Sequence, residues 1–139
     1  MTLVEVVIAL GIAALTIGGI VNGYIYCTTS AIKAELAQSA NEQALQRIEQ
    51  VRSAQWDIAV YPAVDQLLAT NFPDETNTLD LPGTNNAAGT PVLIQTTITN
   101  LVPTPLAPPM RTVHVDCIWQ FRGGDWITNS IETILSPNQ

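Results

Sequence analysis

The hydrophobic and polar positions of this chain divide it into an apolar beginning, an amphipathic middle and an alternating end. From Leu3 to Tyr26 the sequence is apolar except for one charged residue, Glu5. A run of this length is enough to cross a bilayer as a helix. Over residues 32–51, apolar side chains recur every three or four positions, which predicts one stripe of an amphipathic helix. The stripe consists of Ile32, Leu36, Ala40, Ala44, Ile48 and Val51.

The two patterns join into one helix, because no proline occurs before Pro62. We expect this helix to run from about residue 2 to about residue 55, which is on the order of 80 Å at the α-helical rise. Such a helix is too long for a small head to bury, which favours polymerisation. We therefore divide the chain into a hydrophobic helix, 1–27, and a globular head, 28–139, that includes the second half of the helix. Leu45, off the stripe, is a candidate contact to a neighbour or an ordinary exposed leucine.

The segment after the helix is polar and rich in turn-forming residues. Residues 56–72 are interpreted as a connector, in which Pro62 opens a short helical turn. The stretch from Pro73 to Pro91 predicts a loop. Within this loop a candidate calcium site is formed by three acidic residues, although their spacing matches no EF-hand and an ordinary solvated loop is favoured. They are Asp74, Glu75 and Asp80.

The last third of the chain alternates apolar and β-branched residues with polar ones, which predicts strands. The alternation covers residues 92–101, 112–121 and 126–135. On the second segment one face carries Val113, Val115, Cys117, Trp119 and Phe121, and on the third it carries Ile127, Ile131 and Leu135.

The turn between the last two segments fixes how these faces meet. A two-residue turn at Gly123-Gly124 would pair Cys117 with Ser130. A three-residue loop, Gly123–Asp125, pairs Cys117 with Ile131 and keeps both apolar faces on one side, so we predict the longer loop. The resulting fold is α+β: a long helix packed on a small, three-stranded antiparallel sheet that covers the helical stripe.

Composition excludes several functions. The chain has 139 residues, of which 47% are hydrophobic and only 12% are charged, and this is too apolar for a disordered protein. The net charge of −7 argues against nucleic-acid binding. His114 is the only histidine, and no motif supplies it with a catalytic partner. We therefore expect a protein that is not an enzyme and that has no cofactor.

A secretory signal peptide is the alternative interpretation of the apolar run. It requires a basic region before the run and a small-residue cleavage site after it. The first basic residue is Lys33, and the residues up to Cys27 form a poor cleavage site, so we expect the helix to be retained.

Within the apolar helix Glu5 is exceptional, because a carboxylate in a membrane helix is costly. Its candidate partner is the α-amino group of Met1, in the same chain or in an adjacent one; the alternative is that Glu5 reaches the membrane interface.

Glycines interrupt the apolar helix. Each glycine in a helix interior costs up to about 1 kcal/mol relative to alanine. Gly18, Gly19 and Gly23 lie close together and form a candidate weak spot, where the helix unwinds inside a fibre. The alternative is that these small residues permit close helix–helix approach.

The first ten residues, MTLVEVVIAL, resemble the mature amino terminus of type IV pilins and the related pseudopilins. The family pattern is Met or an aromatic residue, Thr-Leu, an aliphatic residue, Glu and a long apolar stretch. The resemblance implies that a prepilin peptidase cleaves before Met1, that Met1 is methylated, and that Glu5 pairs with the amine of an adjacent subunit. Met1 is interpreted as the mature first residue, the alternative being an initiator. The family often has proline where this chain has Asn22.

The resemblance implies a structural subunit of an extracellular type IV pilus-like filament, a helical homopolymer. Such a subunit lies in the inner membrane until pilus or secretion assembly machinery adds it to a fibre at the cell surface, where fibres serve cell adhesion, motility or DNA uptake. One alternative is a pseudopilin or minor pilin of a type II secretion system. Residues 42–56 resemble these proteins more than they resemble the best-known adhesive pilins. An alternative from another class is a monomeric bitopic membrane-anchored binding protein.

The two cysteines allow one intrachain disulfide. A bond between Cys27 and Cys117 would fasten the head to the stalk, and an exported compartment permits it. Two separate thiols are the alternative.

Overall fold

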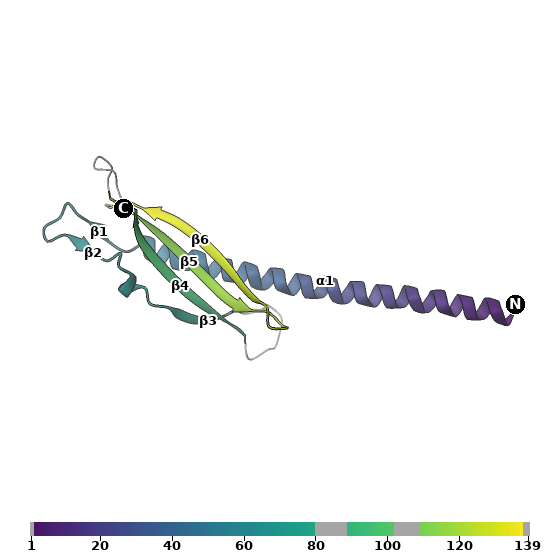
Figure 1. The fold of residues 1–139 in the computed structure, drawn as a ribbon. Coiled ribbons are helices and arrows are strands. Elements are labelled where there is room, and N and C mark those ends of the chain that lie inside the picture. The colour runs from purple at the N-terminus through teal and green to yellow at the C-terminus, as the bar shows by residue number, and fades with distance from the viewer. Residues whose placement is uncertain (1, 80–88, 102–108, 138–139) are drawn as a thin grey trace. The chain divides into compact units, whose positions relative to one another are not determined.

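The computed structural model describes residues 2–79, 89–101 and 109–137 (Figure 1). One α-helix, α1, extends without a break from Leu3 to Arg52, so the single long helix expected from the sequence is confirmed. The chain separates into two units, Met1–Glu35 and Leu36–Gln139. The second unit contains the last part of α1 and all of the strands, and it is the head described next.

The head packs the end of α1 against an antiparallel sheet, which confirms the α+β class. The helical stripe predicted from the sequence supplies the helix side of the core, and its members Leu36, Ala40, Ala44, Ile48 and Val51 are all buried. Ile32 is only partly buried. Because Ala40 and Ala44 are the smallest members of the stripe and are fully buried, they allow the helix backbone to approach the sheet closely.

Over the described residues the sheet has four strands in the order β3-β4-β5-β6, and each neighbouring pair is antiparallel. The strands are β3 (Glu75–Leu79), β4 (Thr90–Leu101), β5 (Met110–Gln120) and β6 (Trp126–Leu135). The predicted three-stranded meander corresponds to β4, β5 and β6. Strand β3 falls in the stretch predicted to be a loop, so that prediction is wrong there. Only Leu79 of β3 is buried, so this edge strand carries almost no apolar alternation by which to recognise it.

The inner face of the sheet is the one that the sequence predicts. Val113, Val115, Cys117 and Trp119 of β5 are buried, while Phe121, just after the strand, is partly exposed. The indole N–H of Trp119 donates to Asn129 Oδ1 at 2.9 Å. The amide of Asn129 in turn donates to Asn41 Oδ1 on α1 at 3.1 Å, so a chain of polar contacts links β5, β6 and the helix.

The register of the β5–β6 hairpin differs from the prediction by two residues. Cys117 lies opposite Asn129 and not opposite Ile131, which faces Val115. The loop is three residues long, as expected, but it consists of residues 122–124: the N–H of Phe121 donates to the carbonyl of Asp125 at 2.9 Å. The reason is that Gly123 and Gly124 both have positive φ, at 106° and 96°, so both glycines belong inside the loop and Asp125 closes it. A shift of two residues keeps every side chain on its face, which is why the facing is right although the register is wrong.

The connector between helix and sheet contains a small ribbon. Strand β1 (Trp56–Asp57) pairs with β2 (Val64–Asp65), and a single 3₁₀ turn, η1, follows at Ala69–Asn71. The helical turn predicted to begin at Pro62 is therefore wrong. The ribbon forms because Gln66 N–H donates to the carbonyl of Gln55, which brings the chain back beside the end of α1.

Arg47 is a buried cation on the inner side of the helix. Its Nε donates to Thr96 Oγ1 of β4 at 3.0 Å, and its NH2 group donates to the carbonyl of Pro73. Glu75 of β3 lies 3.6 Å from its NH1 group. One side chain thus joins α1 to β3, to β4 and to Pro73 just before β3, which compensates for the few apolar contacts that β3 makes.

Candidate functional site

The candidate site that the sequence points to is the first half of α1. In the unit Met1–Glu35, every large apolar side chain from Leu3 to Tyr26 is exposed. This part of α1 is long and apolar enough to cross a membrane, and none of its most apolar window is buried within the subunit. At roughly 1.5–3 kcal/mol for each large side chain, covering this surface is worth on the order of 20 kcal/mol or more. That exceeds the roughly 5–15 kcal/mol that stabilises a typical domain. A membrane anchor or a bundle of other helices is what such a surface requires.

Glu5 lies in the first turn of α1 and forms a reciprocal cap with Thr2. The backbone N–H of Thr2 donates to Glu5 Oε2 at 3.0 Å, and the N–H of Glu5 donates to Thr2 Oγ1 at 3.4 Å. This is a capping box, which satisfies two of the unpaired N–H groups at a helix start. Sequence reasoning considered only an amine partner or the membrane interface for Glu5. The spacing Thr-x-x-Glu before an apolar run was the signal for the cap.

The cap leaves hydrogen-bond acceptor positions of the Glu5 carboxylate free. A carboxylate has two oxygens and about four acceptor positions, and both bonds from Thr2 go to Oε2. Glu5 can therefore accept a further donor, such as an amine, while the helix start stays capped. Met1, whose amine is the expected partner, lies outside the described residues.

The glycine cluster leaves α1 intact. The helix is continuous through Gly18, Gly19 and Gly23, and a Cβ atom added at any of the three meets nothing within 4 Å. Among the described residues, no contact therefore requires glycine at these positions. Unwinding in a fibre and close helix–helix approach both concern what surrounds the helix, so both interpretations stay open.

The cysteines are free thiols in the structure. Cys27 is exposed on α1, and Cys117 is buried on the inner face of β5. Burial, with a smaller contribution from the negative charge of Asp116, raises the pKa of Cys117 to about 11. The thiol therefore stays protonated at neutral pH and serves as an apolar core residue.

Two of the three candidate calcium ligands, Asp74 and Glu75, are engaged elsewhere. Asp74 Oδ2 accepts from the amide of Gln95 at 3.0 Å, and Glu75 is paired with Arg47. Asp80 lies outside the described residues. In the part of the chain that the structure describes, no three acidic, histidine or cysteine side chains come together as metal ligands.

His114 lies on the outer face of β5, as expected, and its Nε2 is 3.0 Å from Asp116 Oδ1. Ser130 of β6 donates to the same oxygen. These residue types are those of a hydrolase triad, but here the carboxylate stands between the hydroxyl and the imidazole. In a triad the imidazole must contact the hydroxyl in order to take its proton. The arrangement therefore gives Ser130 no base, and it is a surface polar cluster.

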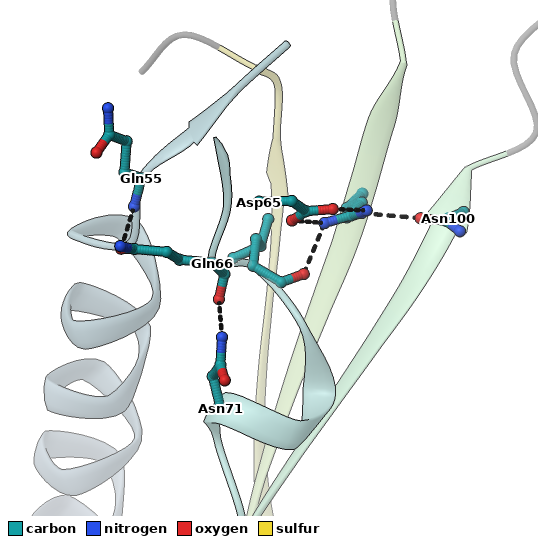
Figure 2. A network of polar contacts seen from close by, with 7 residues as sticks. Gln55, Asp65, Gln66, Asn71 and Asn100 are labelled. Atoms are coloured by element: carbon teal, nitrogen blue, oxygen red, sulfur yellow. Dashed lines mark hydrogen bonds and ion pairs between the residues drawn. The ribbon is translucent and has the colours of Figure 1, made fainter. Parts of the chain in front are cut away.

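An arginine cluster that sequence reasoning missed holds the connector on the sheet (Figure 2). Arg111 of β5 makes a bidentate pair with Asp65, at 2.6 and 2.7 Å, and donates to the carbonyl of Leu67 at 2.6 Å. Its Nε donates to Asn100 of β4 at 2.9 Å, and its guanidinium lies 4.5 Å from the ring centre of Trp56. No local sequence signal marks it, because the partners lie far away along the chain.

This cluster has an electrostatic signature. The hydrogen bonds that Arg111 donates to the carboxylate of Asp65 hold the pKa of Asp65 below its ordinary value, because they outweigh the opposite effect of partial burial. The same pair raises the pKa of Arg111. Both groups are therefore charged throughout the physiological range, and the cluster acts as a fixed clamp.

Beside the clamp, Gln66 contacts Gln55, just before the connector, and Asn71, near the end of the connector. Its side-chain oxygen accepts from the N–H of Gln55 at 3.1 Å, and its carbonyl accepts from the amide of Asn71 at 2.8 Å (Figure 2). The connector is thus fastened by polar contacts at several points.

The fold and the site define a class: an apolar helix compatible with membrane anchoring, continuous with an α+β head. Comparison of the chain with models of protein families, with curated proteins and with solved structures gave no match.

Proposed function

We propose that the chain is a structural subunit of an extracellular type IV pilus-like filament, which polymerises through its amino-terminal helix. The observation that carries the proposal is the bare apolar surface of α1 from Leu3 to Tyr26, with the carboxylate of Glu5 in its first turn. A membrane satisfies the apolar surface before assembly, and the helices of neighbouring subunits satisfy it afterwards.

Glu5 supports polymerisation over simple anchoring. An anchor needs no charge, and a carboxylate in the hydrocarbon region costs several kcal/mol unless it finds a partner. The amine of an adjacent subunit, displaced along the fibre, supplies a partner that a lone helix lacks. The cap with Thr2 keeps the carboxylate at the helix start, where such an amine would arrive.

The resemblance of the first ten residues to pilins sets the remaining expectations. Processing by a prepilin peptidase, methylation of Met1, residence in the inner membrane and display at the cell surface all follow from it. A pseudopilin or minor pilin of a secretion system shares these features and remains the second candidate. It would appear as a short fibre or as rare copies within a fibre made of another subunit.

The test separates the charge of Glu5 from its cap. Glu5→Gln removes the charge but keeps a side chain that serves in a capping box, whereas Thr2→Ala removes the hydroxyl of the cap and keeps the charge. Glu35→Gln makes the same chemical change at an exposed position further along α1. Filaments are counted by electron microscopy of the producing cells, and the subunit in the membrane fraction is quantified by immunoblot.

We expect Glu5→Gln to abolish filaments while the membrane level is unchanged, and Glu35→Gln to assemble as the parent does. Filaments of normal number in Glu5→Gln would refute the assigned role of the charge. If the parent chain itself yields only single copies in the membrane, the bitopic binding protein is the better description. Mass spectrometry of the first residue for methylation tests the processing step independently.

A further inference from the structure

One tryptophan of the head is unlike the others. Trp56 and Trp119 are 7% and 0% exposed, whereas Trp126 is 70% exposed. Trp126 begins β6, directly after Arg122 of the β5–β6 turn and Asp125, which closes that turn; both are also exposed. Trp126 is therefore the tryptophan whose ring is free to contact something outside the subunit.

The turn has a definite place in the head. Strand β6 runs alongside α1 in the same direction, because Asn129 contacts Asn41 and, further along, Thr133 contacts Arg52. The β5–β6 turn therefore lies at the end of the head where α1 enters, at Leu36 (Figure 1). The β1–β2 ribbon, which follows the end of α1, lies at the opposite end of the sheet.

Chain connectivity limits how far this end of the head can lie from a membrane. The apolar run ends at Tyr26, and residues 27–35 continue as helix, a distance on the order of 14 Å at the α-helical rise. The polar headgroup region adds roughly 5–7 Å to each side of the hydrocarbon core. Because the limit comes from the length of the connecting segment, it applies for any orientation of the two units.

The side chains at this end have the chemistry of a membrane interface. Tryptophan is enriched at the level of the headgroups, where its ring is buried and its N–H stays hydrated. The guanidinium of Arg122 suits lipid phosphate. Asp125 and the net charge of −7 disfavour a strongly anionic surface, so zwitterionic phospholipid is the better match.

We propose that the β5–β6 turn is a second membrane contact, in which Trp126 enters the headgroup region of a zwitterionic phospholipid bilayer and Arg122 contacts phosphate. The inference rests on the membrane-anchored stage of the proposed function but does not require polymerisation. It gives the head a preferred end toward the bilayer before assembly.

The full-length chain in phosphatidylcholine vesicles provides the test, because all three tryptophans lie in the head. Tryptophan emission is measured in vesicles whose lipids carry bromine near the headgroup end of the acyl chains, and in vesicles with bromine near the chain ends. The Trp126→Phe variant identifies the contribution of Trp126. The matched control combines Trp126→Phe with Tyr61→Trp, which moves the exposed indole to the 99%-exposed position in the ribbon at the opposite end.

We expect Trp126 emission to shift to shorter wavelength and to lose intensity with the shallow bromine more than with the deep one. The control with the indole at position 61 should show neither change. Emission typical of water, without quenching, would overturn the proposal. Equal quenching of an indole at position 126 and of one at position 61 would overturn it as well, since the head would then lie on the bilayer without a preferred end.

A neighbouring copy is the other occupant that the test recognises. In that case the shift of Trp126 emission to shorter wavelength depends on the amount of protein per lipid, and brominated lipid does not quench the emission. That result also overturns the proposal. Glu5→Gln separates the two functions: it should leave Trp126 quenching unchanged even though it abolishes filaments. A failure of polymerisation and a failure of the membrane contact are therefore distinguishable.

Discussion

The clamp around Arg111 permits a prediction whose magnitude follows from the structure. In Arg111→Met, Asp65 loses its bidentate partner, the carbonyl of Leu67 loses a charged donor, and Trp56 loses the guanidinium over its ring. The side chain of Arg111 is 14% exposed and that of Asp65 is 36% exposed, so Asp65 recovers much of its hydration when the arginine is gone.

The partial exposure of Asp65 sets the size of the effect. The ion pair by itself is worth at most about 1 kcal/mol when one partner is this exposed. The carbonyl left unpaired adds about 1–2 kcal/mol, and the contact with the indole adds about 0.5–1 kcal/mol. We expect Arg111→Met to destabilise the head by about 2–4 kcal/mol, which for a head of this size lowers Tm by on the order of 10–20 °C.

The assay is thermal unfolding of the full-length chain in detergent, followed by near-ultraviolet circular dichroism of the buried tryptophans. Arg122→Met makes the same change at the exposed arginine of the β5–β6 turn and should shift stability by less than about 0.5 kcal/mol. Stability of Arg111→Met equal to that of Arg122→Met would refute the clamp.

The pH dependence provides a second, independent sign. The pKa of Asp65 is lowered in the folded state, so its pairing stabilises the head above the ordinary aspartate pKa, and the contribution is lost as pH falls through the folded value. The difference between the parent and Arg111→Met should therefore be largest near about pH 7 and shrink toward about pH 2. A difference that is independent of pH would mean that the arginine acts by packing alone.

Two further predictions concern the core thiol and the hairpin turn. At about pH 8, a maleimide should label Cys27 in the folded chain and leave Cys117 unreacted until the head unfolds. The reason is that Cys117 is buried and has a pKa of about 11. Labelling is measured by mass spectrometry, and equal labelling of the two cysteines would contradict the prediction. Gly123→Ala should lower the stability of the head by about 1–2 kcal/mol, because φ is +106° there, whereas Gly11→Ala, in open space on α1, should leave the thermal transition of the head unchanged.

Local patterns in the sequence predicted much of this molecule. The long helix follows from a run without proline, and its buried side follows from spacings of three and four, since the period of a helix fixes which residues share a face. The same reasoning with a period of two identified the inner face of β5. The apolar surface around Glu5 needed no tertiary information, because the large apolar side chains from Leu3 to Tyr26 are exposed.

Features that depend on partners distant in sequence were predicted poorly. The hairpin register was wrong by two residues because alternation is satisfied equally by any even shift, and only the backbone angles of Gly123 and Gly124 chose among them. Strand β3 was missed because its residues are mostly polar and exposed, and pairing with β4 is what makes it a strand.

The sequence by itself determined the apolar helix, its amphipathic continuation and the two faces of the strands, because each depends on periodicity within one segment. Tertiary structure alone decided which strands are neighbours, where the hairpin turns, and how Arg47 and Arg111 fasten distant segments together. Charged side chains of this kind carry no local signature. Their role arises only when folding brings a carbonyl or a carboxylate within hydrogen-bonding distance.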